Sequence, residues 1–301
     1  MDAPPDDSSE TQMGQRLEQV ALLLRHLEVL RGRPVIALIA PEFPIVPEMV
    51  QAFNQVLRRM PEVSQLDLLL ESSGGDVDSA VKIAKLCFNY TQDFQVLVPF
   101  YAKSAASLLA LYGKTLVMTK ASELGPVDPQ VRPPGVRDQW VPAHSVDEAV
   151  KFIGEVEEPI VKAALVEKLD PYIIGAYRNA QEASRQYLSE ALALHSQAKR
   201  DEVVEVFTRR LRSHGYPIDR ERCRELGLNV QFPDPQVEKA MEDVQELYEE
   251  ILTTVGRFAF IVQSQVGWYV QVRSRIYKRY LGSEATTSGA LPEVAPASDD
   301  G

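Results

Sequence analysis

One serine and one pair of glycines have the residue types and positions that acyl transfer would need. Ser104 follows a strand-like segment and begins a helix-like run of small residues, so its hydroxyl would lie near the positive end of that helix. The N–H of Ala105 could then hold an oxyanion. Gly74 and Gly75 directly precede another helix-like segment, where exposed backbone N–H groups can bind a developing negative charge. A nucleophile with such donors is the minimum of an acyl-transfer site.

Each of these junctions also has an ordinary structural interpretation. Serine is a favoured N-cap residue, and Ser104 could do no more than begin its helix. Gly74 and Gly75 could make a tight turn before Asp76, which would cap the following helix. The combination is more informative, because both junctions follow successive strands, and open α/β sheets bind ligands at the carboxyl ends of their strands.

The elements that must position these residues alternate between strand and helix. A continuous apolar run of strand length occurs at residues 34–40, and further strand-like segments occur at residues 66–70, 95–98 and 115–118. Helical spacing of apolar residues occurs before and between them, at residues 13–31, 47–60, 77–88 and 102–111. This alternation predicts a parallel sheet with crossover helices. Mostly helical patterns follow at residues 145–211 and 234–252, so we expect a helical layer after the α/β core.

Composition narrows the functional class. Of the 301 residues, 45% are hydrophobic and 25% are charged, which is typical of soluble globular proteins. Asp and Glu number 43 against 32 Lys and Arg, and the net charge of -11 argues against a general nucleic-acid binder. The two cysteines, Cys87 and Cys223, lack C-x-x-C spacing. We therefore expect neither a zinc cluster nor a disulfide framework, and we expect a reducing compartment.

No stretch of the sequence has the length and apolarity of a membrane-spanning helix. The two most apolar candidates, residues 20–30 and 258–272, contain polar or charged residues and fall short of the ~20 residues that a span needs. The N-terminal ten residues are acidic, whereas a signal peptide begins with basic ones. These features predict a cytoplasmic protein without a transmembrane segment.

The same patterns divide the chain into four parts. Residues 1–11 and 283–301 are small, polar and proline-bearing, and they predict disordered tails. Between them we expect one α/β domain with a helical arm over residues 12–255, followed by a C-terminal extension over residues 256–282.

Residues 98–130 carry the most specific sequence motif. Val98–Leu111 and Glu123–Gln130 resemble the serine dehydrogenase proteinase family of the Clp protease/crotonase superfamily. Shorter segments extend the resemblance over roughly residues 15–255, namely 72–77, 141–145, 214–219 and 225–228. The resemblance implies an α/β fold, a Clp/crotonase-like spiral of β-α units with a mostly helical C-terminal layer.

The resemblance also implies roles for individual residues. Ser104 would be the nucleophile, and Gly74 and Ala105 would donate the N–H groups of the oxyanion hole. Gly75 would let the backbone approach the substrate closely, and residues 123–130 would wall the cleft. The substrate would be a polypeptide, no metal or other cofactor would be required, and the helical arms would stack in a homo-oligomer.

The general base is the part of the family pattern from which this sequence departs. Related Clp peptidases have a histidine roughly 25 residues after the serine, where this chain has Gly125–Pro129. The superfamily's Ser-Lys members use a later lysine instead, and Lys151 lies in the corresponding region. Such a lysine must be buried to act as a base at pH 7. His144 begins the same predicted helix and needs no large pKa shift.

Other polar residues have weaker claims to catalysis. Lys103 is adjacent to Ser104, but neighbours in sequence usually point apart, and Lys162 is more distant. Lys151 itself could be an ordinary solvated helix lysine. His214 is interpreted as the anchor of a turn, and Asp128 before Pro129 as a turn residue.

The favoured hypothesis is a serine peptidase that forms an acyl-enzyme on Ser104, with Lys151 or His144 as general base. One alternative is an inactive scaffold that keeps the fold without a working base. Another is a crotonase-type enzyme that holds an acyl thioester with the same paired N–H groups. The peptidase requires Ser104, whereas both alternatives should tolerate Ser104→Ala.

Overall fold

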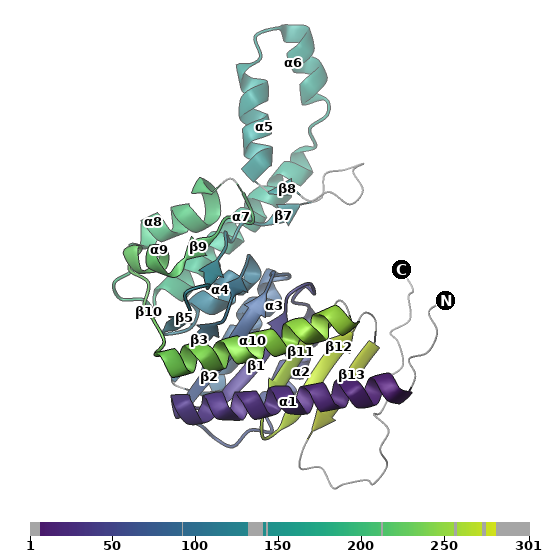
Figure 1. Cartoon of the computed structure of the whole chain (residues 1–301). Coiled ribbons are helices and arrows are strands. Elements are labelled where there is room, and N and C mark those ends of the chain that lie inside the picture. Colours follow the sequence, from purple (N-terminus) through teal and green to yellow (C-terminus); the bar gives the residue numbers. More distant parts are fainter. Residues whose placement is uncertain are drawn as a thin grey trace.

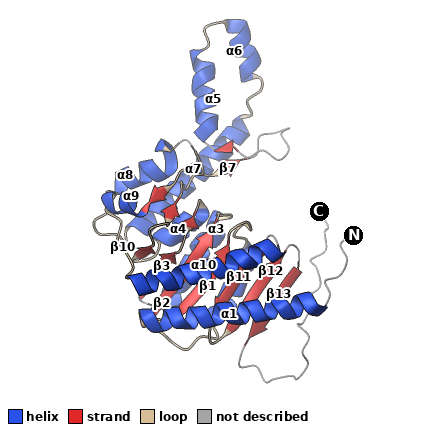
Figure 2. Ribbon diagram, viewed as in Figure 1, coloured by secondary structure: helices blue, strands red, loops and turns tan. Residues whose placement is uncertain are grey.

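A curled mixed sheet organises the protein (Figures 1 and 2). The computed structural model describes residues 7–91, 93–131, 141–142, 144–211, 213–255, 258–272 and 275–280. The main path of the sheet runs β10-β5-β3-β2-β1-β11-β12-β13. These strands are β1 (Val35–Ala40), β2 (Gln65–Ser72), β3 (Asp93–Val98), β5 (Leu116–Met118), β10 (Val230–Gln231), β11 (Phe258–Gln263), β12 (Gly267–Val272) and β13 (Arg275–Tyr280).

The prediction of a parallel sheet with crossover helices is confirmed for the four predicted strands, because β1, β2, β3 and β5 pair in parallel. The short strand β10, which the sequence pattern does not predict, also pairs in parallel with β5. The three C-terminal strands then continue the sheet in antiparallel fashion from β1. The segment predicted as a C-terminal extension thus supplies strands to the central sheet.

Helices cover both faces of the sheet, and the strands are apolar on both sides. Along β1, Ile36 and Leu38 face one hydrophobic cluster, whereas Val35 and Ala37 face the other, as the two-residue period of a strand requires. The first cluster includes α2 (Pro47–Leu57), α3 (Val77–Tyr90) and α4 (Ala105–Leu111). The second includes α1 (Asp7–Arg31) and α10 (Pro235–Val255), which lie side by side in Figure 1.

The predicted helical layer forms an arm and its base. Figure 1 shows α5 (His144–Glu155) and α6 (Pro159–Val166) projecting from the body of the molecule, with α7 (Pro171–Leu192) beneath them. Proline at the first turn begins both α6 and α7, and Asp170 caps α7. The base also contains β7 (Gln130–Val131), β8 (Val141–Pro142), α8 (Arg200–Glu205), the π-helical turn η1 (Val206–Arg210) and α9 (Arg220–Glu225).

Three very short strands branch from the main sheet. They are β4 (Tyr101–Ala102), β6 (Glu123–Leu124) and β9 (Ile218–Asp219). β4 pairs with β2 and β6, and β6 pairs in turn with β9, so residues near 102, 124 and 218 are brought together. This branch carries the chain into the segments that hold Ser104, Asp128 and His214.

Two element boundaries differ from the sequence-based prediction. The helix predicted from residue 102 begins at Ala105, because Tyr101 and Ala102 pair as β4 instead. The first helix begins at Asp7, inside the predicted tail, since extending a formed helix costs little once it has nucleated. None of the helices in the described ranges is long and apolar enough to cross a membrane.

Candidate active site

Ser104 has a strained backbone at the turn between β4 and α4. Its φ of +52° and ψ of -123° make it the one non-glycine residue with positive φ in the described chain. Such a conformation costs about 1–3 kcal/mol and persists only where the surroundings enforce it. The half-buried side chain makes no capping hydrogen bond to α4, and no other described group hydrogen-bonds its hydroxyl. The ordinary N-cap role therefore does not explain this serine.

The glycine turn after β2 packs directly against Ser104. A Cβ on Gly74 would lie 2.7 Å from Ser104 Cβ and 3.2 Å from the backbone nitrogen of Ala105, so glycine is required there. A Cβ on Gly75 would lie 2.3 Å from the backbone nitrogen of Ile45, and its φ of +145° also favours glycine. The structure thus brings Gly74, Gly75, Ser104 and Ala105 together at one edge of the sheet.

The backbone N–H groups of this turn are not equivalent. The Gly74 N–H donates to Ser72 Oγ at 3.0 Å, which is at odds with its predicted role as an oxyanion donor. The Ile45 N–H donates to the Gly74 carbonyl, and the Ile45 carbonyl accepts from the Asp76 N–H. These two hydrogen bonds flank Gly75 and leave its own N–H unused. The N–H groups of Gly75 and Ala105 have no acceptor among the described residues, so these two are available to a substrate.

Asp128 and His214 form a hydrogen-bonded pair beyond the short strands. His214 Nδ1 lies 2.7 Å from Asp128 Oδ1; the aspartate is 4% exposed and the histidine side chain 30% exposed. Continuing the register of β6 and β9 past Leu124 and Ile218 places Asp128 opposite His214. β6 also pairs with β4, and the Gly125 N–H donates to the Ala102 carbonyl two residues before Ser104. The pair therefore follows the same group of short strands that leads to the serine.

Ser107 and Lys103 hold this edge in place. The buried Ser107 hydroxyl donates to the Ala102 carbonyl at 2.5 Å and accepts from the Gly125 N–H at 2.9 Å, which joins β4 to the chain after β6. Lys103 Nζ lies 2.5 Å from Glu123 Oε1 and 3.3 Å from the Leu124 carbonyl. Lys103 thus points toward β6, and its ammonium is engaged there.

The bases predicted from the sequence lie on the arm. Lys151 belongs to α5, its side chain is 66% exposed, and Nζ donates to Glu148 Oε1 at 2.9 Å. Lys162 on α6 is half-buried and donates to the Gly154 carbonyl at 2.8 Å. His144 begins α5, but its side chain lies outside the described residues. Nothing described joins Lys151 or Lys162 to Ser104, and Figure 1 shows α5 projecting away from α4.

Comparison with known proteins supports the fold and the family. The model of the ClpP-like SDH-type serine proteinases matches residues 8–266. The chain belongs to this family. Two uncharacterized proteins of Methanocaldococcus jannaschii are similar to it. One is 29% identical over 69% of this chain and 66% of its own length, slightly less than two thirds, and the other is 27% identical over 80% of both chains.

A solved structure is also similar to this chain at low identity. It is a mutant of the membrane-bound stomatin-specific protease 1510-N, with a TM-score of 0.40, 12% identity, and coverage of 70% of this chain and 80% of that one. This likeness is too distant to carry an argument about the site. The expected Clp/crotonase-like α/β fold agrees with the family match and the curled sheet.

The sequence pattern indicates Asp128 and His214 only as separate turn residues. The signal that could have joined them was the position of Asp128, which stands where related Clp peptidases have their histidine. His214 begins another of the segments that carry the family resemblance. Their contact spans 86 positions of the chain and depends on the pairing of β6 with β9.

A buried carboxyl lies directly before the glycine turn. Glu71, the penultimate residue of β2, is 2% exposed, and burial raises its pKa to about 8. The Tyr248 hydroxyl of α10 lies beside it, and the burial of that phenol and the nearby carboxyl raise the pKa of Tyr248 above its usual range. Glu71 is thus largely protonated at pH 7 and adds little negative charge near the glycine turn.

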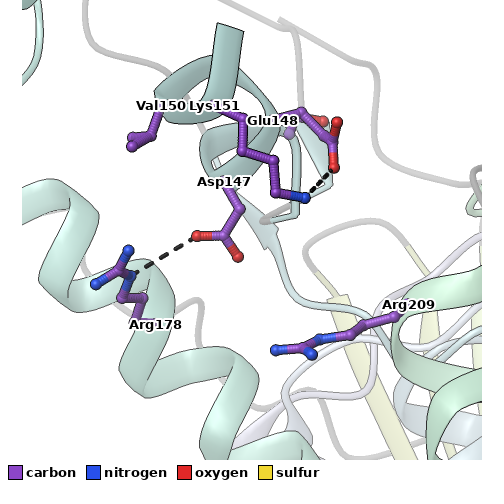
Figure 3. Close-up of a pocket in the computed structure, with 7 residues that line it drawn as sticks. Asp147, Glu148, Val150, Lys151, Arg178 and Arg209 are labelled. Atoms are coloured by element: carbon purple, nitrogen blue, oxygen red, sulfur yellow. Dashed lines mark hydrogen bonds and ion pairs between the residues drawn. The ribbon is translucent and has the colours of Figure 1, made fainter. Parts of the chain in front are cut away.

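A pocket of about 530 Å³ lies at the base of the arm (Figure 3). Residues from α5, α7 and η1 line it: Ser145, Asp147, Glu148, Val150, Lys151, Arg178 and Arg209. Within the described ranges, no group of three or more histidine, cysteine or acidic residues could hold a metal ion.

Proposed function

We propose that this ClpP-like proteinase hydrolyses peptide bonds through an acyl-enzyme on Ser104. The observation that carries the proposal is the strained Ser104 backbone, which holds a hydroxyl with no partner in the described chain against two unused N–H groups. Strained residues of this kind cluster at active sites, where the strain can be part of the mechanism. Here it would expose a nucleophile beside an oxyanion hole.

His214 is the base that the geometry supports best. The Asp128 carboxylate accepts from Nδ1–H, which leaves Nε2 as the nitrogen able to take a proton. Asp128 is buried, so it would orient the ring and stabilise the imidazolium that forms. The order of the three groups in the chain is serine, aspartate, histidine, and such groups are recognised by geometry rather than by their order.

The protein contributes only side chains and backbone groups to the proposed reaction. Ser104 Oγ attacks the peptide carbonyl carbon as His214 Nε2 takes the hydroxyl proton. The N–H groups of Gly75 and Ala105 hold the resulting oxyanion, and Gly74 keeps the turn close to the serine. The imidazolium then gives its proton to the leaving amine. A water molecule then attacks the acyl carbon as the same histidine takes its proton. The bond to Ser104 Oγ breaks, the histidine returns the proton to Oγ, and the acyl group leaves as a carboxylic acid.

Lys151 and His144 are the competing bases, and a labelling experiment separates them. A fluorophosphonate reacts with an activated serine, so its rate reports the base. We expect His214→Gln to slow labelling of the purified protein by about 100-fold or more, since 100-fold is the lower end of the range for general acid–base catalysis. Lys151→Ala and His144→Ala should label at the wild-type rate. A slow Lys151→Ala or His144→Ala variant with a normal His214→Gln variant would reassign the base.

We further propose that the protein forms a homo-oligomer through its arm. None of the residues of α6 is buried, although the helix is mostly apolar, and Ile160 is 79% exposed. Phe152 on α5 and Tyr172 on α7 are also exposed, at 60% and 89%. Exposed large apolar side chains on three neighbouring helices are typical of an interface, and a second copy of the same arm matches them in chemistry. Ile160→Glu should lower the mass measured by analytical ultracentrifugation, whereas Lys168→Glu should not.

A further inference from the structure

The pocket at the base of the arm has an unusual charge for this protein. Three of its seven lining residues are cationic (Lys151, Arg178 and Arg209) and two are acidic (Asp147 and Glu148), whereas the whole chain has a net charge of -11. A positive pocket in an acidic protein focuses the local field on anions.

Two of the three cations have carboxylate partners within the pocket. Lys151 Nζ lies 2.9 Å from Glu148 Oε1, and Arg178 Nε lies 3.7 Å from Asp147 Oδ1. The exposed guanidinium of Arg209 has no hydrogen bond or ion pair to any part of the chain that the structure describes. Figure 3 shows it extending from η1 toward Asp147 and Arg178 on the opposite wall. Arg209 is therefore the cation that remains available to a ligand.

The backbone connects this pocket to the candidate active site. The Phe207 carbonyl accepts a 2.7 Å hydrogen bond from the Val127 N–H, directly before Asp128. Arg209 follows Phe207 by two residues in the π-helical turn η1, and His214 follows Arg209 by five. π-Helical turns occur frequently at functional sites. The same short segment thus holds both the pocket's free cation and the histidine.

We propose that this pocket binds a carboxylate of the peptide substrate, with Arg209 as the residue that contacts it. A guanidinium presents parallel N–H donors that match the two oxygens of a carboxylate. The carboxylate could be the free C-terminus of the peptide or an Asp or Glu side chain. The naming of a peptide as the ligand rests on the proposed peptidase function, whereas the carboxylate site rests on the pocket itself.

Binding to the Ser104→Ala protein tests the site without catalysis. Three matched libraries of N-acetylated octapeptides with randomised uncharged residues would serve as probes. One ends in a free carboxylate, one in an amide, and one in an amide with a single internal Glu. Peptides retained with the protein on gel filtration are quantified by mass spectrometry. We expect at least one carboxylate library to be retained about tenfold more than the amide library, the effect of one charge-assisted contact.

Substitutions then assign the contact. Adding Arg209→Gln should abolish the preference, and Arg209→Lys should restore only part of it. Arg210→Gln removes the same charge from the next residue, which is exposed but does not line the pocket, and it should keep the preference. Both arginines are on the surface, and equal melting temperatures would show that the variants are folded.

The outcomes separate the two proposals. Retention of only one carboxylate library identifies the C-terminus or the acidic side chain as the source. Equal retention of all three libraries, or equal losses in Arg209→Gln and Arg210→Gln, would overturn the carboxylate site. Failure of Ser104 to react with a fluorophosphonate would instead overturn the peptidase function, because peptide binding to the Ser104→Ala protein does not depend on that reaction.

Discussion

Replacing Glu71 with glutamine should stabilise the protein increasingly as the pH rises. The carboxyl of Glu71 is buried beside Tyr248, and its pKa is raised from 4.5 to about 8. Between these two values the folded protein binds a proton that the unfolded chain releases, so the wild type loses stability with rising pH. A neutral glutamine of nearly the same shape has no such dependence.

The size of the effect follows from the two pKa values. Each pH unit between them costs the wild type up to about 1.4 kcal/mol, so the advantage of Glu71→Gln should grow by about 2–3 kcal/mol between pH 5 and pH 7. Urea denaturation of both proteins at one protein concentration, at several pH values from 5 to 8, measures this difference. The other titrating groups are common to both proteins, so their contributions cancel in the difference between the two stabilities.

An exposed carboxylate provides the control for this series. Glu250→Gln alters a residue whose ion-pair partner Arg16 is itself exposed, and its stability relative to the wild type should vary little with pH. A difference between Glu71→Gln and the wild type that stays constant from pH 5 to pH 8 would refute the argument that burial keeps Glu71 protonated.

Three further substitutions test how the fold holds the site. Ser104→Gly should be about 1 kcal/mol more stable than Ser104→Ala in urea, because glycine relieves the positive φ; equal stabilities would contradict the strain. Gly75→Ala should lose fluorophosphonate labelling because its Cβ would strike Ile45, whereas Gly154→Ala, which meets nothing within 4 Å, should label normally. Asp67→Asn should lower the free energy of unfolding by about 3–5 kcal/mol, because it leaves Arg31 and Arg33 buried without their full partner, and a loss below 1 kcal/mol would contradict this.

The main elements of the fold could be predicted because they bury long periodic patterns. β1 is a continuous apolar run, β2 is rich in leucine and almost entirely buried, and α2 and α3 repeat apolar residues at helical spacing. The strands that shape the site have no such pattern. β4, β6 and β9 are two residues long each, too short to show any periodicity, and tertiary pairing alone determines them.

Only part of the candidate site could be predicted from the sequence. Ser104 and the glycine pair lie at strand-to-helix junctions, which sequence patterns reveal. The use of the Gly74 N–H by Ser72 and the pairing of Asp128 with His214 depend on side-chain positions that no local pattern encodes. A lysine base was expected by analogy, yet the structure holds Lys151 in an exposed ion pair on the arm.

The residue that carries a covalent label decides whether Ser104 is the nucleophile. The purified protein is treated with a fluorophosphonate and digested, and the adduct is located by tandem mass spectrometry. We predict one adduct, on Ser104, that is absent from Ser104→Ala and strongly reduced in His214→Gln. An adduct on Ser72 or Ser107, or no adduct on a folded protein, would contradict the assignment of Ser104 as the nucleophile.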